Sequence, residues 1–269
     1  MKILIDGDIV AYRSAAVCNE PDQRGLACWQ AREMLQGIYK SYPHHEPVVY
    51  LSGPNNFRYD LYPEYKANRK NMKRPMWLDA VKDTMTEDGA ITTDGYEADD
   101  ALGINYEPGD IIASIDKDLL QIPGVHYNFV KDLELDIDEW DGLYTFYRQV
   151  LTGDSTDNIP GIRGIGPKKA DAILAGCTNE QDLHTRVRGA YNDDTAYLLN
   201  ARLVWILRQE NVHWTFPSFG PEEDQSSESM QTTPEESDPS TEPTTKSETD
   251  DGIQSLGDEM ESTFLVIPS

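Results

Sequence analysis

The stretch MKILIDGDIV (residues 1–10) decides the fold of this chain. Its apolar run Ile3, Leu4, Ile5 shows no alternation with polar residues, which is typical of a strand buried on both faces of a parallel sheet. The run ends in two aspartates, Asp6 and Asp8. In open sheets of parallel strands, binding sites lie beyond the carboxyl ends of the strands. We therefore expect a functional site at these two residues.

Two further apolar runs repeat this pattern later in the chain. PVVYLSG (47–53) is β-branched and runs into Gly-Pro, and DIIASID (110–116) ends in an acid. Helical patterns lie between them, over residues 26–39 and after Glu97. Strands that alternate with helices predict an α/β fold, a mostly parallel central sheet with helices on both faces. DLELDID (132–138) alternates strictly and predicts an edge strand with a charged outer face.

The chain length of 269 residues permits one or two domains. We expect an α/β core over residues 1–150, with a basic, aromatic-rich segment at about 57–93. A helical region should follow over 151–217, with helices near 180–188 and 192–209. Residues 218–269 carry 14 acids and one base, and the run PEEDQSSESMQTTPEESDPSTEPTTKSETDDG (221–252) has almost no large apolar residue. Such a segment cannot bury enough surface to offset its ordering entropy, so we predict a disordered acidic tail.

Composition excludes several classes of protein. The chain has no apolar stretch long enough to span a membrane and no signal-peptide pattern. Cys18, Cys28 and Cys177 are odd in number and form no C-x-x-C pair, which predicts a reducing, cytoplasmic location. A net charge of -25 ordinarily argues against nucleic-acid binding. That argument weakens if the tail holds much of the charge and many other acids bind metal.

Three acidic clusters accompany the first strand: YEADDALG (96–103), SIDKDLL (114–120) and LTGDSTDNIPG (151–161). Each alone is more commonly a solvated helix face, a cap or a turn. Their joint placement at strand ends and helix starts predicts convergence. Converging carboxylates repel by several kcal/mol at low dielectric unless a cation offsets them. Mg²⁺ prefers such oxygen ligands, and paired divalent ions support phosphodiester hydrolysis.

The segment GIRGIGPKKADAIL (161–174) is rich in glycine and then basic. Gly161, Gly164 and Gly166 permit positive φ angles and close approach of a backbone, and Pro167 suits the first turn of a helix. Lys168 and Lys169 fall in that same turn. Free N–H groups at a helix start, flanked by lysines, predict a site for DNA phosphate. The plainer alternative is a tight turn between two helices.

In this order, the motifs resemble the 5′-nuclease superfamily, which includes bacteriophage 5′→3′ exonucleases, flap endonucleases and the 5′-nuclease domain of bacterial DNA polymerase I. The resemblance is carried by Asp6, YEADD (96–100), DKD (116–118), GDSTDN (153–158) and GIRGIGPKK (161–169). PEYKANRK (63–70) resembles the basic segment at the base of the family's helical arch. The resemblance implies a PIN-like fold with that arch and a C-terminal helix-hairpin-helix region. The short length and NARLVWILR (200–208) look most like phage exonucleases.

The resemblance also implies roles for individual residues. It places a first metal at Asp6, Glu97, Asp99 and Asp100, and a second at Asp116, Asp118, Asp154 and Asp157. The ions would be Mg²⁺, with Mn²⁺ able to substitute, and K⁺ would bind at the helix-hairpin-helix turn. Lys66 and Arg69 would be catalytic, in contact with the scissile phosphate. DNA would be bound by Tyr65, whose ring stacks on an unpaired base, and by Arg74, Gly161, Gly164, Gly166, Lys168 and Lys169.

The function implied is a metal-dependent 5′→3′ exonuclease or flap endonuclease that hydrolyses phosphodiester bonds at DNA 5′ ends, flaps or nicks. It would serve phage-type replication or recombination as a monomer, in the host cytoplasm if phage-encoded. One departure concerns the second strand, where many members carry an aspartate and this chain has Gly53 and Pro54. Either the first metal has fewer carboxylates, or Asp8 assists.

Two other functions fit parts of the sequence. Asp6-Gly7-Asp8-Ile9-Val10 and Gly153-Asp154…Asp157 also fit haloacid-dehalogenase-type phosphatases, in which the first aspartate is a nucleophile. That alternative leaves the glycine-lysine turn, the basic segment and YEADD unexplained. A non-catalytic DNA-binding relative should have lost several acids, yet eight candidate ligands are present. The tail is either an inert solubilising segment or a docking peptide or DNA mimic, which could contact a replication protein.

Overall fold

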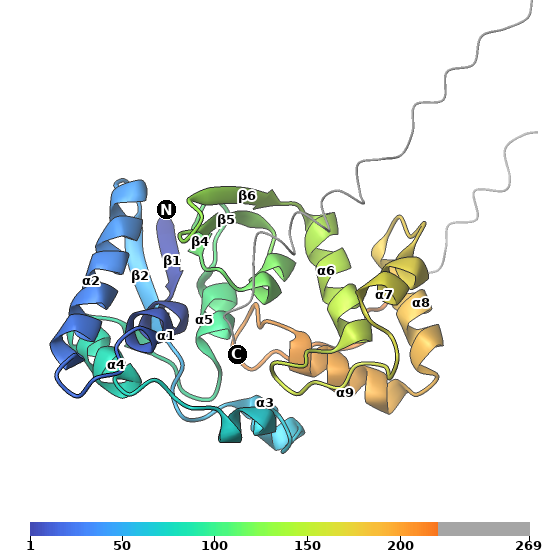
Figure 1. The fold of residues 1–269 in the computed structure, drawn as a ribbon. Helices are drawn as coiled ribbons and strands as arrows, with labels where there is room; N and C mark the ends of the chain where they lie inside the picture. Colours follow the sequence, from blue (N-terminus) through green and yellow to red (C-terminus); the bar gives the residue numbers. More distant parts are fainter. Residues whose placement is uncertain (220–269) are drawn as a thin grey trace, which may run out of the picture.

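A computed structural model describes residues 1–219, apart from the side chain of Asn71. Its centre is a six-stranded sheet in the order β3-β2-β1-β4-β5-β6 (Figure 1). Strands β1 to β5 run parallel, and β6 pairs antiparallel with β5. The predicted mostly parallel central sheet is confirmed. The strands are β1 (Lys2–Asp6), β2 (Glu46–Leu51), β3 (Ile91–Thr92), β4 (Ile111–Ala113), β5 (Gly124–Asn128) and β6 (Leu133–Ile137).

Helices cover both faces of this sheet, as the alternating pattern predicts. The predicted helices at 26–39, 180–188 and 192–209 correspond to α2, α8 and α9, although α9 ends earlier, at Val204. The helices are α1 (Gly7–Ala16), α2 (Arg24–Ser41), α3 (Phe57–Leu61), α4 (Leu78–Glu87), α5 (Ala98–Asn105), α6 (Glu139–Thr152), α7 (Pro167–Leu174), α8 (Glu180–Tyr191) and α9 (Asp194–Val204), with 3₁₀ turns η1 (Ala67–Asn71) and η2 (Lys117–Gln121).

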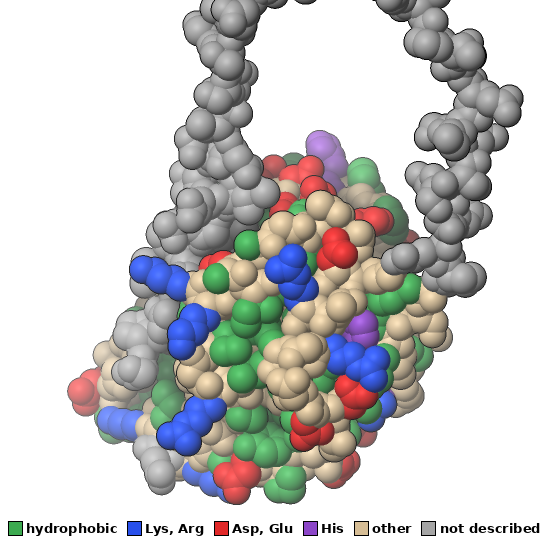
Figure 2. Space-filling view, turned by 90° about the vertical axis from the view of Figure 1, so that its right-hand side faces the viewer, with side chains coloured by type: hydrophobic (Ala, Val, Ile, Leu, Met, Phe, Trp, Pro, Cys, Tyr) green, Lys and Arg blue, Asp and Glu red, His purple; other side chains and the backbone are tan. Residues whose placement is uncertain are grey.

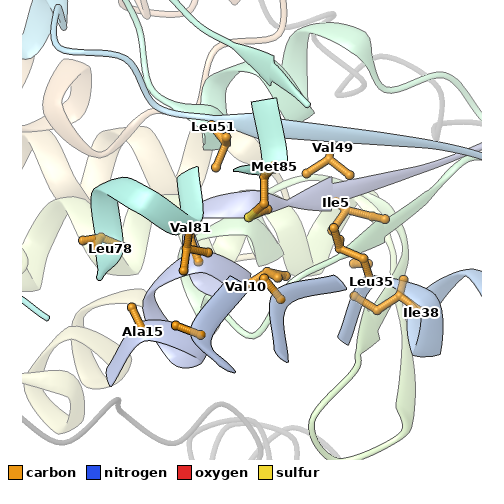
Figure 3. Packing of buried hydrophobic residues seen from close by; sticks show 14 of the residues in the cluster. Ile5, Val10, Ala15, Leu35, Ile38, Val49, Leu51, Leu78, Val81 and Met85 are labelled. Atoms are coloured by element: carbon orange, nitrogen blue, oxygen red, sulfur yellow. The ribbon is translucent and has the colours of Figure 1, made fainter. Parts of the chain in front are cut away.

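Strand β1 is buried on both faces because its neighbouring side chains point to opposite sides. Ile3 and Ile5 pack with α1, α2 and α4, in the cluster drawn in Figure 3. Leu4 points the other way and packs against Leu102 of α5. Helix α1 begins immediately after β1, since the Asp6 side chain accepts a hydrogen bond from the Ile9 amide at 3.2 Å. This rigid junction fixes Asp6 at the carboxyl edge of the sheet.

Helices α6 to α9 form a second apolar cluster around aromatic side chains such as Tyr147, Tyr197 and Trp214. The predicted boundary between residues 150 and 151 falls inside α6, which continues to Thr152. The predicted edge strand is confirmed as β6, the outermost strand of the sheet. Of its three apolar residues, Ile137 is buried, Leu135 is half-buried and Leu133 is exposed.

The basic segment at 57–93 crosses the carboxyl edge of the sheet as short helices. α3 contacts α9 on one side, and α4 contacts α1 and α2 on the other (Figure 1). Between them, the Asn68 side chain of η1 donates a 2.7 Å hydrogen bond to the carbonyl of Ser155. These contacts attach α3, η1 and α4 to the body of the molecule, and the arch itself stays a prediction. The predicted disordered tail lies outside the described residues, except for 218–219.

Candidate metal centre and phosphate-binding turn

The ends of β1 and β4 are joined by a buried hydrogen-bond network. Asp6 is 1% exposed, and its Oδ2 accepts a 2.8 Å bond from the hydroxyl of Ser114. The same Ser114 oxygen accepts the amide of Asp116 at 3.0 Å. Burial, and then the charge of Asp8, raise the pKa of Asp6 to about 7. The two strand ends therefore present carboxylates to one place, as predicted.

Asp116, the N-cap residue of η2, shares that environment with two more carboxylates, Asp99 on α5 and Asp118 in the first turn of η2. Burial and the charges of Asp6 and Asp116 raise the pKa of Asp99 well above its usual range. Burial and the charges of Asp116, Asp154 and Asp157 do the same for Asp118. The pKa of Asp116 is raised too, mainly by burial, although the Asp118 amide bonds its Oδ1 at 2.9 Å. Their ionised forms are therefore disfavoured where they stand, and a bound cation would stabilise them.

Glu97 and Asp157 are paired with two cations of the basic segment. The Lys66 ammonium is paired with Glu97 and lies 3.5 Å from Asp157 Oδ2, and the Arg69 guanidinium is paired with the other oxygen of Asp157. Burial alone would raise the pKa of Glu97, but the charges of Lys66 and Arg58 lower it to about 2. The predicted catalytic cations therefore do lie among the predicted metal ligands.

Lys66 is held there by an unusual backbone. Its φ of 54° lies in the left-handed region, which costs a non-glycine residue about 1–2 kcal/mol. Its amide donates to the carbonyl of Asp157 at 2.8 Å, which supports that conformation. Strain of this kind is concentrated at functional sites. It supports a functional role for Lys66 independently of its charge.

Asp100 does not belong to this centre, which corrects the predicted ligand set. It is completely buried, and its two oxygens accept hydrogen bonds of 2.6 and 2.9 Å from the guanidinium of Arg58. The amides of Glu97 and Leu207 bond it as well, at 3.1 and 3.0 Å. Asp99 and Asp100 are adjacent on a helix, so they point about 100° apart. One faces the site and the other faces the core.

Tyr65 also departs from its predicted role. Its side chain is 2% exposed, so its ring is not available to stack on a base. Its hydroxyl lies 2.8 Å from Glu97 Oε2 and 3.0 Å from Asp157 Oδ2. The prediction of a stacking face is therefore wrong, and Tyr65 instead supports the two carboxylates that Lys66 pairs with. Arg74 is on the surface, paired with Asp79.

The donor chemistry of the centre suits a hard divalent cation, because the converging groups are all carboxylates. Within residues 1–219, however, no three carboxylate, imidazole or thiol groups already stand close enough to hold one ion together. Lys66 and Arg69 draw Glu97 and Asp157 to themselves, while the remaining carboxylates repel each other. A bound cation would have to draw these side chains inward.

The glycine-lysine turn precedes α7 as predicted. Gly161 and Gly164 have φ angles of 56° and 84°, and Gly166 is the N-cap residue of α7. A Cβ at Gly161 would lie 2.3 Å from the Gly153 nitrogen, so this position requires glycine. Lys168 and Lys169 are exposed, and the Lys169 ammonium donates to the Gly164 carbonyl at 2.8 Å. Figure 2, which views the molecule from its right-hand side, shows its Lys and Arg side chains dispersed among apolar and acidic ones.

Sequence reasoning missed four residues that organise the centre: Ser114, Arg58, Ser52 and Lys82. The Lys82 ammonium lies 2.6 Å from Asp8 Oδ1, and the Ser52 amide lies 3.3 Å from both Asp8 oxygens. These partners are far from Asp6, Asp8 and Asp100 along the chain, so no local spacing could have indicated them.

The described part of the chain also contains no helix of the length and hydropathy needed to cross a bilayer.

Residues 1–144 match the family described as "5′-3′ exonuclease, N-terminal resolvase-like domain". The chain is 35% identical over 152 residues to a DNA polymerase I of Rhizobium leguminosarum, covering 49% of this chain and 15% of that protein. It is 29% identical over 210 residues to a 5′-3′ exonuclease of Buchnera aphidicola (69% and 73%). A flap endonuclease Xni of Shewanella frigidimarina is 32% identical over 196 residues (64% and 75%). The chain thus spans a small part of the polymerase and most of the stand-alone relatives.

Solved structures of a bacteriophage T5 enzyme share the fold. One, a 5′-exonuclease with divalent zinc ions bound, aligns with a TM-score of 0.56 at 20% identity, covering 76% of this chain and 88% of that chain. Another is a T5 flap endonuclease in a pseudo-enzyme–product complex with DNA and metal ions, with a TM-score of 0.55 at 19% identity, covering 75% and 88%. At this level of identity, the likeness concerns the arrangement of the helices and strands.

Proposed function

The chain belongs to the 5′-nuclease superfamily, and we propose from that premise that it is a metal-dependent nuclease acting on DNA 5′ ends and flaps in the 5′→3′ direction. One observation carries the proposal. Carboxylates from the ends of β1 and β4 and from α5 raise each other's pKa, immediately beside the Lys66 and Arg69 pair. Buried carboxylates next to two positively charged side chains form an arrangement suited to a metal-assisted reaction on a phosphate.

Within this proposal, Asp6, Glu97 and Asp99 would hold a first divalent ion, and Asp116, Asp118, Asp154 and Asp157 a second. Asp100 is left out because Arg58 occupies both of its oxygens. When bound, such ions supply water activation and stabilisation of a leaving oxygen. We propose Mg²⁺ as the natural ion, with Mn²⁺ able to replace it, since the donors are hard oxygens.

Lys66 and Arg69 would serve as the phosphate-binding cations of the reaction. In this structure they are paired with Glu97 and Asp157, and they compensate the negative charges of these two carboxylates. A cation bound to those carboxylates would release the ammonium and the guanidinium toward a substrate phosphate. Arg69 is suited to this because its guanidinium can contact two phosphate oxygens at once.

The turn at 161–169 would bind the duplex at its phosphates, away from the reacting bond. The exposed Lys168 and the N-terminus of α7 supply charge and N–H donors there. We propose that this turn acts as a helix-hairpin-helix element, with K⁺ at its carbonyls. Contacts to phosphates carry no sequence information, so binding should be independent of base sequence. We also propose that the enzyme is a monomer, that it acts in the cytoplasm and that it serves phage-type replication.

A phosphatase of the haloacid-dehalogenase type is not favoured by the structure. In that chemistry, the first aspartate must approach the substrate as a nucleophile. Asp6 is 1% exposed and is bonded by Ser114 and by the Ile9 amide. Asp8, which would be the acid/base residue, is paired with Lys82.

One experiment tests the proposed function directly. Full-length protein is incubated with Mg²⁺, Mn²⁺, Ca²⁺ or chelator and with duplex, nicked and flap DNA labelled at either the 5′ or the 3′ end. We expect release of the 5′ label with Mg²⁺ or Mn²⁺ and none with chelator. A small phosphomonoester is included in parallel. Release of phosphate from it, with intact DNA, would contradict the nuclease and favour the phosphatase.

A further inference from the structure

The end of β2 carries no carboxylate, although its neighbour β1 ends in Asp6. β2 runs into Ser52, Gly53 and Pro54. No side chain fits at Gly53, because its Cβ would lie 2.1 Å from the carbonyl oxygen of Thr93. The Gly53 amide also donates to the Thr93 hydroxyl at 3.3 Å, so the loop is closed against β3. Ser52, Gly53 and Pro54 therefore contribute no carboxylate at this strand end.

Asp8 reaches that position from the first turn of α1. The Ser52 amide donates to both of its carboxylate oxygens, at 3.3 Å each. The Ser52 hydroxyl in turn accepts the amide of Ala98 at 2.9 Å, at the start of α5. One serine therefore connects Asp8 to the helix that presents Asp99. The charge of Asp8 also acts on Asp6 from this position.

Lys82 of α4 is the counter-ion of Asp8 in this structure. Its ammonium lies 2.6 Å from Asp8 Oδ1 and 3.3 Å from the carbonyl of Ser52. The Lys82 and Asp8 side chains are 25% and 32% exposed. Partly exposed ion pairs contribute little to stability, because water screens them. A divalent cation, with twice the charge of the ammonium, can therefore displace it from Asp8.

We propose that Asp8 is a further ligand of the divalent cation at the end of β1, and that Lys82 holds its carboxylate until that cation binds. The inference rests on the proposed function in assuming that a cation binds these carboxylates. It assigns Asp8 to the first ion together with Asp6, Glu97 and Asp99. Lys82 is then a positioning residue that exchanges its partner when the ion is bound.

The test measures Mn²⁺ binding to the full-length protein without DNA, from the electron paramagnetic resonance signal of free Mn²⁺. Asp8→Asn should weaken binding at one site by at least about tenfold. Mutation of a residue that only hydrogen-bonds a metal ligand already lowers metal affinity by about that factor. Lys82→Met should strengthen binding, because the competing ammonium is gone. Asp83→Asn, which removes an exposed carboxylate next to Lys82 on α4, is the matched control and should change nothing.

Opposite signs are the decisive result, since both variants break the same ion pair. If Asp8→Asn and Lys82→Met weaken Mn²⁺ binding equally, the pair merely fastens α4 to α1, and the inference is overturned. Equal affinity in Asp8→Asn and Asp83→Asn overturns it too. Thermal unfolding in chelator monitors folding, and if Asp8→Asn is unfolded, the affinity of Lys82→Met alone decides. No Mn²⁺ binding by the unmodified protein would instead contradict the proposed function, and the role of Asp8 with it.

Discussion

At the scale of single residues, the neighbours Asp99 and Asp100 have opposite energetic roles. Asp100 compensates the buried guanidinium of Arg58, and breaking such a pair by removing one charge costs about 3–5 kcal/mol. Within residues 1–219, Asp99 forms no such ion pair, and its charge is opposed by Asp6 and Asp116. We therefore expect Asp100→Asn to lower the free energy of unfolding by about 3 kcal/mol and Asp99→Asn to raise it, both in chelator.

Denaturant unfolding of the two isosteric variants checks this expectation, and each serves as the other's control. Mn²⁺ titration of the same samples tests whether each residue is a metal ligand. Asp99→Asn should bind Mn²⁺ more weakly, whereas folded Asp100→Asn should retain the affinity of the original protein. A loss of stability in Asp99→Asn that equals the loss in Asp100→Asn would show that the structural division between the two residues is incorrect.

We expect the buried His126 to account for part of the decrease in the free energy of unfolding at acid pH. Burial lowers its pKa from 6.5 to about 4, and its Nε2 lies 2.7 Å from the carbonyl of Ile122. Between these two pH values, the unfolded chain binds a proton that the folded chain does not. The free energy of unfolding therefore falls as the pH falls from about 6.5 to about 4, by roughly 3 kcal/mol in total.

The matched variant is His126→Gln, which keeps a donor for the Ile122 carbonyl but cannot titrate. The two proteins differ only at this group, so the difference between their stabilities isolates its titration. The stability of the original protein relative to the variant should decline between neutral pH and about pH 4, as measured by urea unfolding. A difference that does not vary with pH would contradict the prediction.

At the scale of elements, the turn before α7 should act as a purely electrostatic contact. Lys168 is exposed, whereas the Lys169 ammonium already bonds the Gly164 carbonyl. We expect Lys168→Ala to weaken binding to duplexes of any sequence and to reduce the slope of log affinity against log salt by about 1. Lys169→Ala should also disturb the turn itself.

Fluorescence anisotropy with two duplexes of unrelated sequence, in Ca²⁺ and over a range of salt concentrations, measures that slope. Lys131→Ala, on the sheet side of the molecule between β5 and β6, is the control and should leave the slope as it was. If Lys168→Ala binds with an unchanged slope, the turn does not contact phosphate.

The elements were predictable where the signal is local. The apolar runs of β1, β2 and β4, the glycines of the turn and the N-terminal Pro167 of α7 each depend on neighbouring residues, and the structure confirms them. Helix α1 was not predicted, because the Asp6 side chain that caps it was read only as a candidate ligand. The packing of 57–93 on the body could not be foreseen, since it depends on burial of Arg58 and Tyr65 against distant segments.

The candidate site shows the same limit. Clusters such as YEADD indicate that acids gather, and Asp6, Asp99 and Asp116 do share one environment. Periodicity alone could not decide which of Asp99 and Asp100 faces the site, because that depends on where Arg58 enters the core. The partners of Asp8 lie immediately after β2 and on α4, which pack beside α1 only in the folded chain.

At the scale of the whole molecule, charge is unevenly divided. The net charge of the chain is -25, and residues 218–269, with 14 acids and one base, contribute -13 of it. If the tail competes with DNA, deleting 218–269 should raise affinity for duplex at low salt, and the gain should vanish at high salt because screening removes long-range repulsion. Binding isotherms of the full-length and shortened proteins decide this, with identical thermal unfolding as the control. Isotherms that coincide at low salt would leave the tail without this role.

The Arg58 guanidinium bonds not only Asp100 but also the carbonyls of Leu203 and Trp205, at 2.8 Å each. A ribosome makes these two acceptors long after Arg58 and Asp100 have left its exit tunnel. Until then, the Arg58 guanidinium, which is buried in the folded protein, lacks two of its acceptors. Helix α5, which bears Asp99, is not yet fixed by this network. A nascent chain can therefore complete this buried network only after the end of α9 has been synthesised.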